Sequence, residues 1–239
     1  MSDVVLAFDT ATAATVVGLT GPGIYDPIVR RDDPRPGERP RHAQQLLVLA
    51  TDALEQAGLR LSHVDRVVVG TGPGSFTGLR IGLATARALA LAAEAELVGV
   101  STLRVLAVAA EKGVGRDTVV TPVLDARRGE VFVAAWRAGQ LVVLPRAVAP
   151  DRVGEIAREG GVGRRRLWLA VGDGAIRFRE VLEPLGLSVP SDQSPLHRVD
   201  PLVLCRLGAE GEPAERTSVV PEYLRLPDAE MAFLNRPES

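Results

Sequence analysis

One order of predicted elements occurs twice along the chain, and this repetition constrains the fold more than any other feature. An apolar stretch at Val4–Phe8 ends at Asp9, and a second at Val119–Leu124 ends at Asp125. Each is followed by a turn, a strand, a helix, another strand and a Gly-x-Gly turn that opens a further helix. The two Gly-x-Gly turns are Gly70–Gly72 and Gly172–Gly174. The spacing differs between the copies, so we expect structural self-similarity rather than a tandem repeat.

Each copy predicts a small mixed sheet with helices on its faces. Two such halves resemble the α/β, actin-like (ASKHA) duplicated fold of actin, the heat-shock chaperone ATPases and the sugar kinases. We expect a first lobe at residues 1–101 and a second at residues 102–239, with the C-terminal segment able to return to the first lobe. In working members of that superfold, a hairpin with an acidic residue from each lobe holds Mg-ATP, because tight turns expose N–H groups to phosphate.

The two predicted hairpins carry the residues that would form such a pocket. We interpret Asp9, Thr10, Thr12 and Asp125 as the remnant of a nucleotide site. A phosphate-binding hairpin favours glycine at its tip, so that backbone can approach the ligand, whereas residues 11, 13 and 14 are alanine. We therefore expect a degenerate pocket. The alternative is an ATP-dependent phosphotransferase in which Asp9 and Asp125 organise the metal.

A glycine-rich turn spans Gly72–Gly78, between a predicted strand and a predicted long helix. This context is typical of phosphate binding at a helix N-terminus. The turn nevertheless lacks the Gly-Lys-Ser/Thr of a Walker A loop, and Ser75 does not lie in a Gly-x-Ser-x-Gly elbow. We interpret it as a structural turn that lets the helix approach the sheet closely, with a phosphate site as the alternative.

Composition excludes several kinds of site. The net charge of −2 gives no global electrostatic case for nucleic-acid binding. Cys205 is the single cysteine, so neither an intrachain disulfide nor a multi-cysteine zinc site can form. None of the three histidines is paired at helical spacing, which argues against a metal site and a metallopeptidase. The N-terminus does not read as a signal peptide, and no segment reads as a membrane span, so we expect a cytoplasmic protein.

Several motifs together resemble one family. The run Val67–Gly82, which contains the glycine-rich turn, looks like the signature of the TsaB family, also called YeaZ. Four further stretches are similar to motifs of that family, in the same order along the chain. They are Leu6–Thr10, Gly99–Leu103, Asp125–Val131 and Pro221–Arg225. The resemblance covers residues 4–225.

The resemblance implies the actin-like fold and a role in making threonylcarbamoyladenosine beside the tRNA anticodon. The family's catalytic paralogue, TsaD, carries a His-x-x-x-His motif that residues 100–106 of this chain lack. The resemblance therefore implies a non-catalytic scaffold subunit, without a cofactor, that supports a TsaD-like enzyme. Its other implied partners are a TsaE-like ATPase, a second copy of itself when alone, and tRNA only through the complex.

The long helix after the glycine-rich turn carries small residues four positions apart. Because this spacing places Gly78, Gly82, Ala86 and Ala90 on one ridge, another backbone could approach it closely. The residues alone leave open whether the ridge packs inside the chain or against a partner. The family resemblance favours a partner, so we predict an interface. It comprises Gly78, Gly82, Ala86, Ala90, Leu46, Leu47 and Ala50.

Overall fold

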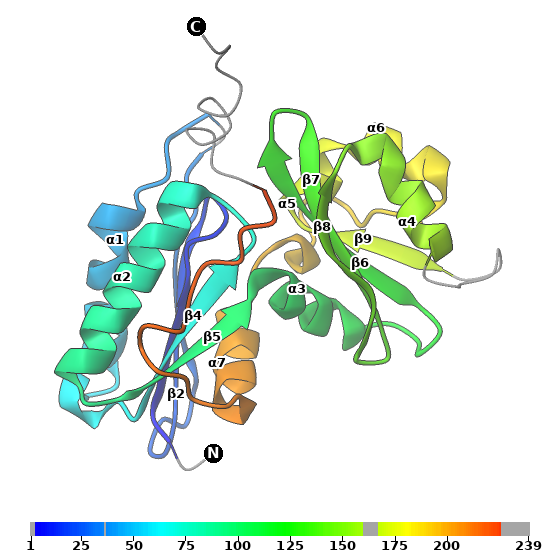
Figure 1. Cartoon of the computed structure of the whole chain (residues 1–239). Helices are drawn as coiled ribbons and strands as arrows, with labels where there is room; N and C mark the ends of the chain where they lie inside the picture. The colour runs from blue at the N-terminus through cyan, green and yellow to red at the C-terminus, as the bar shows by residue number, and fades with distance from the viewer. Residues whose placement is uncertain (1–2, 36, 160–166, 226–239) are drawn as a thin grey trace, which may run out of the picture.

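The computed structural model describes residues 3–35, 37–159 and 167–225, and in them the chain forms two lobes, each built on a five-stranded sheet (Figure 1). The strands of the first sheet are β1 (Val5–Asp9), β2 (Thr15–Thr20), β3 (Ile28–Asp32), β4 (Arg66–Gly72) and β5 (Glu96–Ser101). Those of the second are β6 (Val119–Arg127), β7 (Glu130–Arg137), β8 (Gln140–Val148), β9 (Trp168–Val171) and β10 (Leu187–Ser188).

The strand order confirms the predicted duplication. The first sheet is ordered β3-β2-β1-β4-β5, and the second, read from its β8 edge, is ordered β8-β7-β6-β9-β10. In each sheet the first three strands form antiparallel hairpins, the fourth strand pairs in parallel with the first, and the fifth pairs in parallel with the fourth. The two sequence copies therefore have one topology, although their loops differ in length.

Helices cover both faces of the first sheet. The α-helices are α1 (His42–Gln56), α2 (Phe76–Ala92), α3 (Thr102–Glu111), α4 (Val153–Glu159), α5 (Asp173–Arg177), α6 (Arg179–Leu182) and α7 (Pro201–Glu210). Short 3-10 helices are η1 (Leu61–His63), η2 (Pro150–Arg152), η3 (Glu183–Leu185) and η4 (Pro195–His197). Within β1, Leu6 and Phe8 pack with α1 and α2, whereas Val5 and Ala7 pack with α3 and α7. Burial on both faces explains why this strand is apolar without alternation.

Helix α3 lies between the lobes (Figure 1). Its Leu103 and Leu106 are fully buried and belong to one apolar cluster that contains Val68 of the first sheet and Val120 of the second. The two lobes therefore share a continuous core through this helix.

The C-terminal part of the described chain lies against the first lobe. Helix α7 packs on β1, β2 and β4, and the Ala214 N–H donates to the Leu97 carbonyl at the open edge of β5. Further along, the Val219 carbonyl accepts from Arg87 Nη2 at 2.7 Å, and the Glu222 N–H donates to Thr71 O at 2.8 Å. Residues 226–239 of the predicted second lobe lie outside the described residues.

The segment Arg30–Arg41 is rich in proline and in charges of both signs, a composition that predicts a mobile surface loop. This prediction is wrong for residues 30–32, which lie in β3 and pair with β2. Charges on this strand are compatible with pairing because β3 is an edge strand and only Ile28 is buried in it.

Among the described residues, no helix is long and apolar enough to cross a membrane.

Candidate functional site: the cavity between the lobes

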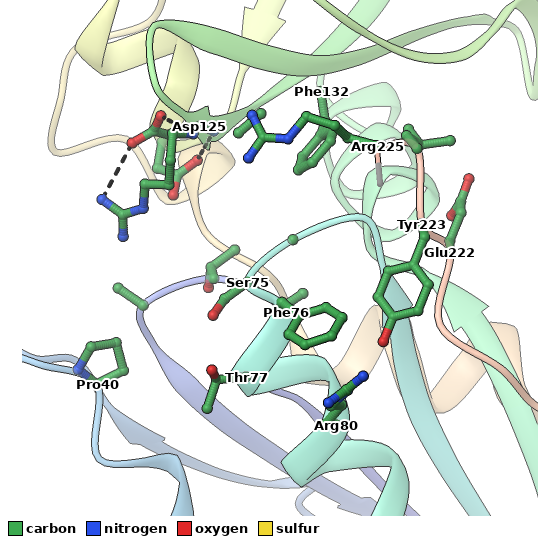
Figure 2. Close-up of a pocket in the computed structure, with 18 residues that line it drawn as sticks. Pro40, Ser75, Phe76, Thr77, Arg80, Asp125, Phe132, Glu222, Tyr223 and Arg225 are labelled. Atoms are coloured by element: carbon green, nitrogen blue, oxygen red, sulfur yellow. Dashed lines mark hydrogen bonds and ion pairs between the residues drawn. The ribbon is translucent and has the colours of Figure 1, made fainter. Parts of the chain in front are cut away.

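A cavity of about 560 Å³ lies between the lobes, and both hairpins contribute to its wall (Figure 2). The first lobe supplies the hairpin tip at residues 11–13 and the glycine-rich turn at residues 74–77. The second lobe supplies residues 125–127, and the C-terminal segment closes one side with residues 222–225. Of the predicted pocket residues, Thr12 and Asp125 line this cavity, whereas Asp9 and Thr10 do not.

Asp9 is buried behind the hairpin instead of facing the cavity. Its carboxylate accepts the Ala11 N–H at 2.7 Å and the Thr102 hydroxyl at 2.6 Å. Burial raises the pKa of Asp9, and the hydrogen bonds from Thr102 and Ala11 oppose that rise. A Cβ on Gly70 would lie 1.9 Å from Asp9 Oδ2, so no side chain fits there. Asp9 therefore joins β1 to α3, and its assignment to the pocket wall is wrong.

Thr10 anchors α2 to the first hairpin. Its hydroxyl donates to Gly78 O at 2.8 Å. A Cβ on Gly78 would lie 2.0 Å from Thr10 O, and one on Gly82 would lie 2.4 Å from Thr10 Oγ1. Both glycines are needed because α2 crosses directly over the hairpin backbone. Thr10 is thus a packing residue and does not face the cavity.

The small-residue ridge of α2 is therefore internal. Ala86 and Ala90 have no exposed surface, and Leu46 and Ala50 of α1 are also buried. The partner interface predicted at Gly78, Gly82, Ala86, Ala90, Leu46 and Ala50 is wrong for these six residues, because the chain's own sheet and hairpin fill the space beside them. Leu47 alone among the predicted interface residues is exposed, at 52%.

The glycine-rich turn packs against the first hairpin tip. A Cβ on Gly74 would lie 2.3 Å from Ala11 O, and the Ser75 N–H donates to that same oxygen at 2.7 Å. Ser75 also caps α2, because its Oγ accepts the Gly78 N–H. These contacts support the interpretation of the turn as structural, because the N–H groups of Ser75 and Gly78, which could bind a phosphate, already donate to acceptors within the chain.

The second hairpin holds its acid between arginines. Asp125 forms ion pairs with Arg177 at 2.6 Å and with Arg127 at 3.5 Å, and it accepts the Arg127 N–H at 2.9 Å. The Asp125 N–H donates to Asp173, whose pKa burial raises. Within the described part of the chain, no three potential metal ligands gather in one place. Asp125 is therefore bound to cations of the protein instead of being open to a metal ion.

The cavity also contains an aromatic and arginine cluster that the sequence analysis did not identify. The rings of Phe76 and Tyr223 lie 5.3 Å apart, and Arg80 Cζ lies 3.7 Å from the Phe76 centroid. Arg225 bonds Glu130 of the second lobe at 2.8 Å. The Pro221–Arg225 motif was the sequence signal that could have identified Tyr223 and Arg225. Its contact with α2, however, depends on the C-terminal segment folding back against the first lobe.

Comparison with known proteins decides the family. The family model of TsaD, tRNA N6-adenosine threonylcarbamoyltransferase, matches residues 37–168. The tRNA threonylcarbamoyladenosine biosynthesis protein TsaB of Escherichia coli K12 is 31% identical over 232 residues, which cover 92% of this chain and 94% of that protein. The chain belongs to the TsaB family. Through the matching model it also falls within the wider TsaD-type family.

Solved structures agree with this TsaB-family assignment. YeaZ from Pseudomonas aeruginosa aligns with a TM-score of 0.73 at 31% identity, covering 94% of this chain and all of that one. A protein with an actin-like ATPase fold from Bacteroides thetaiotaomicron aligns with a TM-score of 0.51 at 8% identity, covering 86% of this chain and 96% of that one. The second match concerns the fold alone. The predicted family and the predicted actin-like fold are both confirmed.

Proposed function

We propose that this TsaB-family chain is a non-catalytic subunit that supports a TsaD-like transferase in the threonylcarbamoylation of the adenosine next to the tRNA anticodon. The name of its E. coli relative and the description of the matching family model both concern this modification. In the proposal, the chain works in the cytoplasm and a TsaE-like ATPase joins the complex. The tRNA is reached through the complex, and the chain forms a homodimer when alone.

The acidic residues of the two hairpins support a non-catalytic role. Asp9 is held by Ala11 and Thr102, and Asp125 is held by Arg127 and Arg177. A phosphotransferase needs acids that can organise a metal ion and its water shell. Both acids here serve as internal supports of the hairpins.

The observation that carries the partner role is an exposed apolar surface on the outer helices of the first lobe. Leu47 and Val48 of α1 are 52% and 58% exposed, and Leu91 of α2 is 64% exposed. The two helices lie side by side (Figure 1), with exposed Ala84 and Ala88 on the same face of α2 as Leu91. Single exposed apolar residues are ordinary, but a group of them on neighbouring elements is typical of a protein interface.

We infer that a TsaD-like subunit and a second copy of this chain compete for this surface, which we name the outer helix surface (Leu47, Val48, Ala84, Ala88 and Leu91). The test is Leu47→Glu, since glutamate keeps the helix while placing a charge in an apolar contact. We expect at least about tenfold weaker binding in a TsaD pull-down titration, because central apolar contacts carry most of the affinity. Reconstituted tRNA modification should fall in parallel.

The matched control is Leu144→Glu, which makes the same change at a leucine that is 69% exposed on β8 of the second lobe. It should bind the TsaD-like subunit as the parent does. Equal loss in both variants, or no loss at Leu47, would contradict the assignment of the outer helix surface. Magnesium-dependent ATP turnover by the purified chain that disappears in Asp125→Asn would support the phosphotransferase alternative instead.

A further inference from the structure

The C-terminal segment of the described chain bridges the two lobes at the cavity. We name residues 214–225 the strap, which runs along the first lobe and ends beside the second (Figure 1). On the first lobe the strap is held by its backbone and by a buried side chain. The Glu222 N–H donates to Thr71 O at 2.8 Å, and Val219 is 5% exposed in the apolar core of that lobe. The strap therefore belongs to the first lobe as far as Glu222.

The end of the strap is held to the second lobe by side chains that solvent reaches. Arg225 Nη1 lies 2.8 Å from Glu130 Oε2, and these two side chains are 21% and 39% exposed. Leu224 is partly buried against the apolar cluster that the lobes share. An ion pair in contact with solvent contributes little to a conformational equilibrium, and dissolved salt screens it. The attachment of the strap to the second lobe is thus the weaker of the two.

The strap lies where the facing walls of the two lobes are apart. The first-lobe wall contains the hairpin tip at residues 11–13, and the second-lobe wall contains the turn at residues 125–127. A cavity of about 560 Å³ lies between these walls, so they gain little packing from each other. Residues 222–225 of the strap line the same cavity. The strap therefore supplies a contact between the lobes on the side where the lobes themselves are separated.

The covalent crossings between the lobes lie away from this cavity. The chain leaves the first sheet at the end of β5, enters α3 at Thr102, and returns through residues 189–200 from β10 to α7. The structure describes all residues of both crossings, and none of them lines the cavity. Rotation of one lobe about the crossings would therefore separate the cavity walls, which is the geometry of a hinge.

We propose that the ion pair between Arg225 and Glu130 is a releasable clip that limits how far the lobes open. Opening breaks this pair and the packing of Leu224, whereas Val219 and Glu222 keep the rest of the strap on the first lobe. A solvent-exposed pair shifts an equilibrium by up to about fivefold, so the clip favours the closed state without locking it. The inference concerns the chain alone and does not rest on the proposed partner role.

The test measures the distance between the lobes by double electron–electron resonance on the full chain. Spin labels are attached to Gln44→Cys on α1 and Leu144→Cys on β8, both at exposed positions. The native Cys205 is buried and does not compete for the label. Labelled chain is diluted with unlabelled chain, so that distances between copies do not contribute. Arg225→Gln should increase the fraction of long distances about two- to fivefold. Sodium chloride at about 1 M should do the same to the parent and change the variant less.

Glu130→Gln should cause the same increase, and the double variant should add nothing to either single variant, because both substitutions remove one pair. Arg152→Gln is the matched control, since it breaks an ion pair with Glu155 inside the second lobe, at 3.1 Å and away from the cavity. It should leave the distances unchanged. Unchanged distances in Arg225→Gln, additive effects in the double variant, or an equal effect in the control would overturn the proposal. A lower Tm in Arg225→Gln with unchanged distances would also overturn it, because the pair would then only stabilise a rigid arrangement.

Discussion

Replacing Gly78 by alanine tests the close packing of α2 on the first hairpin. The added Cβ would lie 2.0 Å from Thr10 O, a separation that real Cβ atoms essentially never show. The obstacle is backbone, so it cannot rotate away as the end of a flexible side chain could. Either α2 or the hairpin must move, and the Thr10 hydroxyl bond to Gly78 O at 2.8 Å is then lost or stretched.

The expected magnitude follows from three contributions. Overpacking a close contact costs about 1–3 kcal/mol, and losing one buried hydrogen bond costs about 1 kcal/mol. Alanine recovers about 1 kcal/mol over glycine through its helix propensity. The free energy of unfolding should therefore fall by about 2 kcal/mol. At about 2–4 °C per kcal/mol for a chain of this size, Tm should drop by roughly 4–8 °C.

The assay is thermal unfolding followed by circular dichroism, with Gly113→Ala as the matched control. A Cβ on Gly113 meets nothing within 4 Å, so the same substitution there should leave Tm within about 1 °C of the parent. If Gly78→Ala also melts like the parent, the direct crossing of α2 over the hairpin is refuted. If it melts normally but loses partner binding, the small-residue ridge would be a partner surface after all.

Two further predictions concern buried titratable groups. Because burial raises the pKa of Asp9, the fold binds this proton more tightly than the unfolded chain does, and stability falls as pH rises from 3.8 through the folded pKa. Asp9→Asn can keep the contacts to Ala11 and Thr102. The free energy of unfolding of this variant, relative to that of the parent, should therefore increase from about pH 4 to pH 7. Denaturant melts in which the difference between variant and parent stays constant over this pH range would contradict the prediction. Burial raises the pKa of Cys205 to about 12, so a thiol reagent at neutral pH should label it only after unfolding, and rapid labelling of the native chain would refute its burial.

The sequence predicted the fold well because its strongest signals are local and repeated. Apolar runs such as Val4–Phe8 and Val67–Val69 correspond to central strands, and a strand buried on both faces is continuously apolar. The edge strand β3 was missed because its residues 30–32 are charged. An edge strand is held by backbone hydrogen bonds to its one neighbouring strand, and this pairing requires no particular pattern of side chains.

The site was predicted less well because side-chain direction depends on tertiary contacts. The position of Asp9 at the end of a strand was identified correctly, but spacing cannot show that the hydroxyl of Thr102, 93 residues later, donates a hydrogen bond to the Asp9 carboxylate. The ridge of α2 has the same periodicity whether its neighbour is another chain or the hairpin at Thr10. Only the distances from Gly78 and Gly82 to Thr10 distinguish the two cases.

The return of the C-terminal segment has a consequence for how the chain can be made. The face of the first sheet that includes Val5, Ala7 and Val68 is shared by α3 and α7, and α7 begins only at Pro201. During synthesis, the first five strands and α3 emerge well before α7 does. The part of that apolar face that α7 covers must therefore stay open, or be bound by another protein, until nearly the whole protein has left the ribosome.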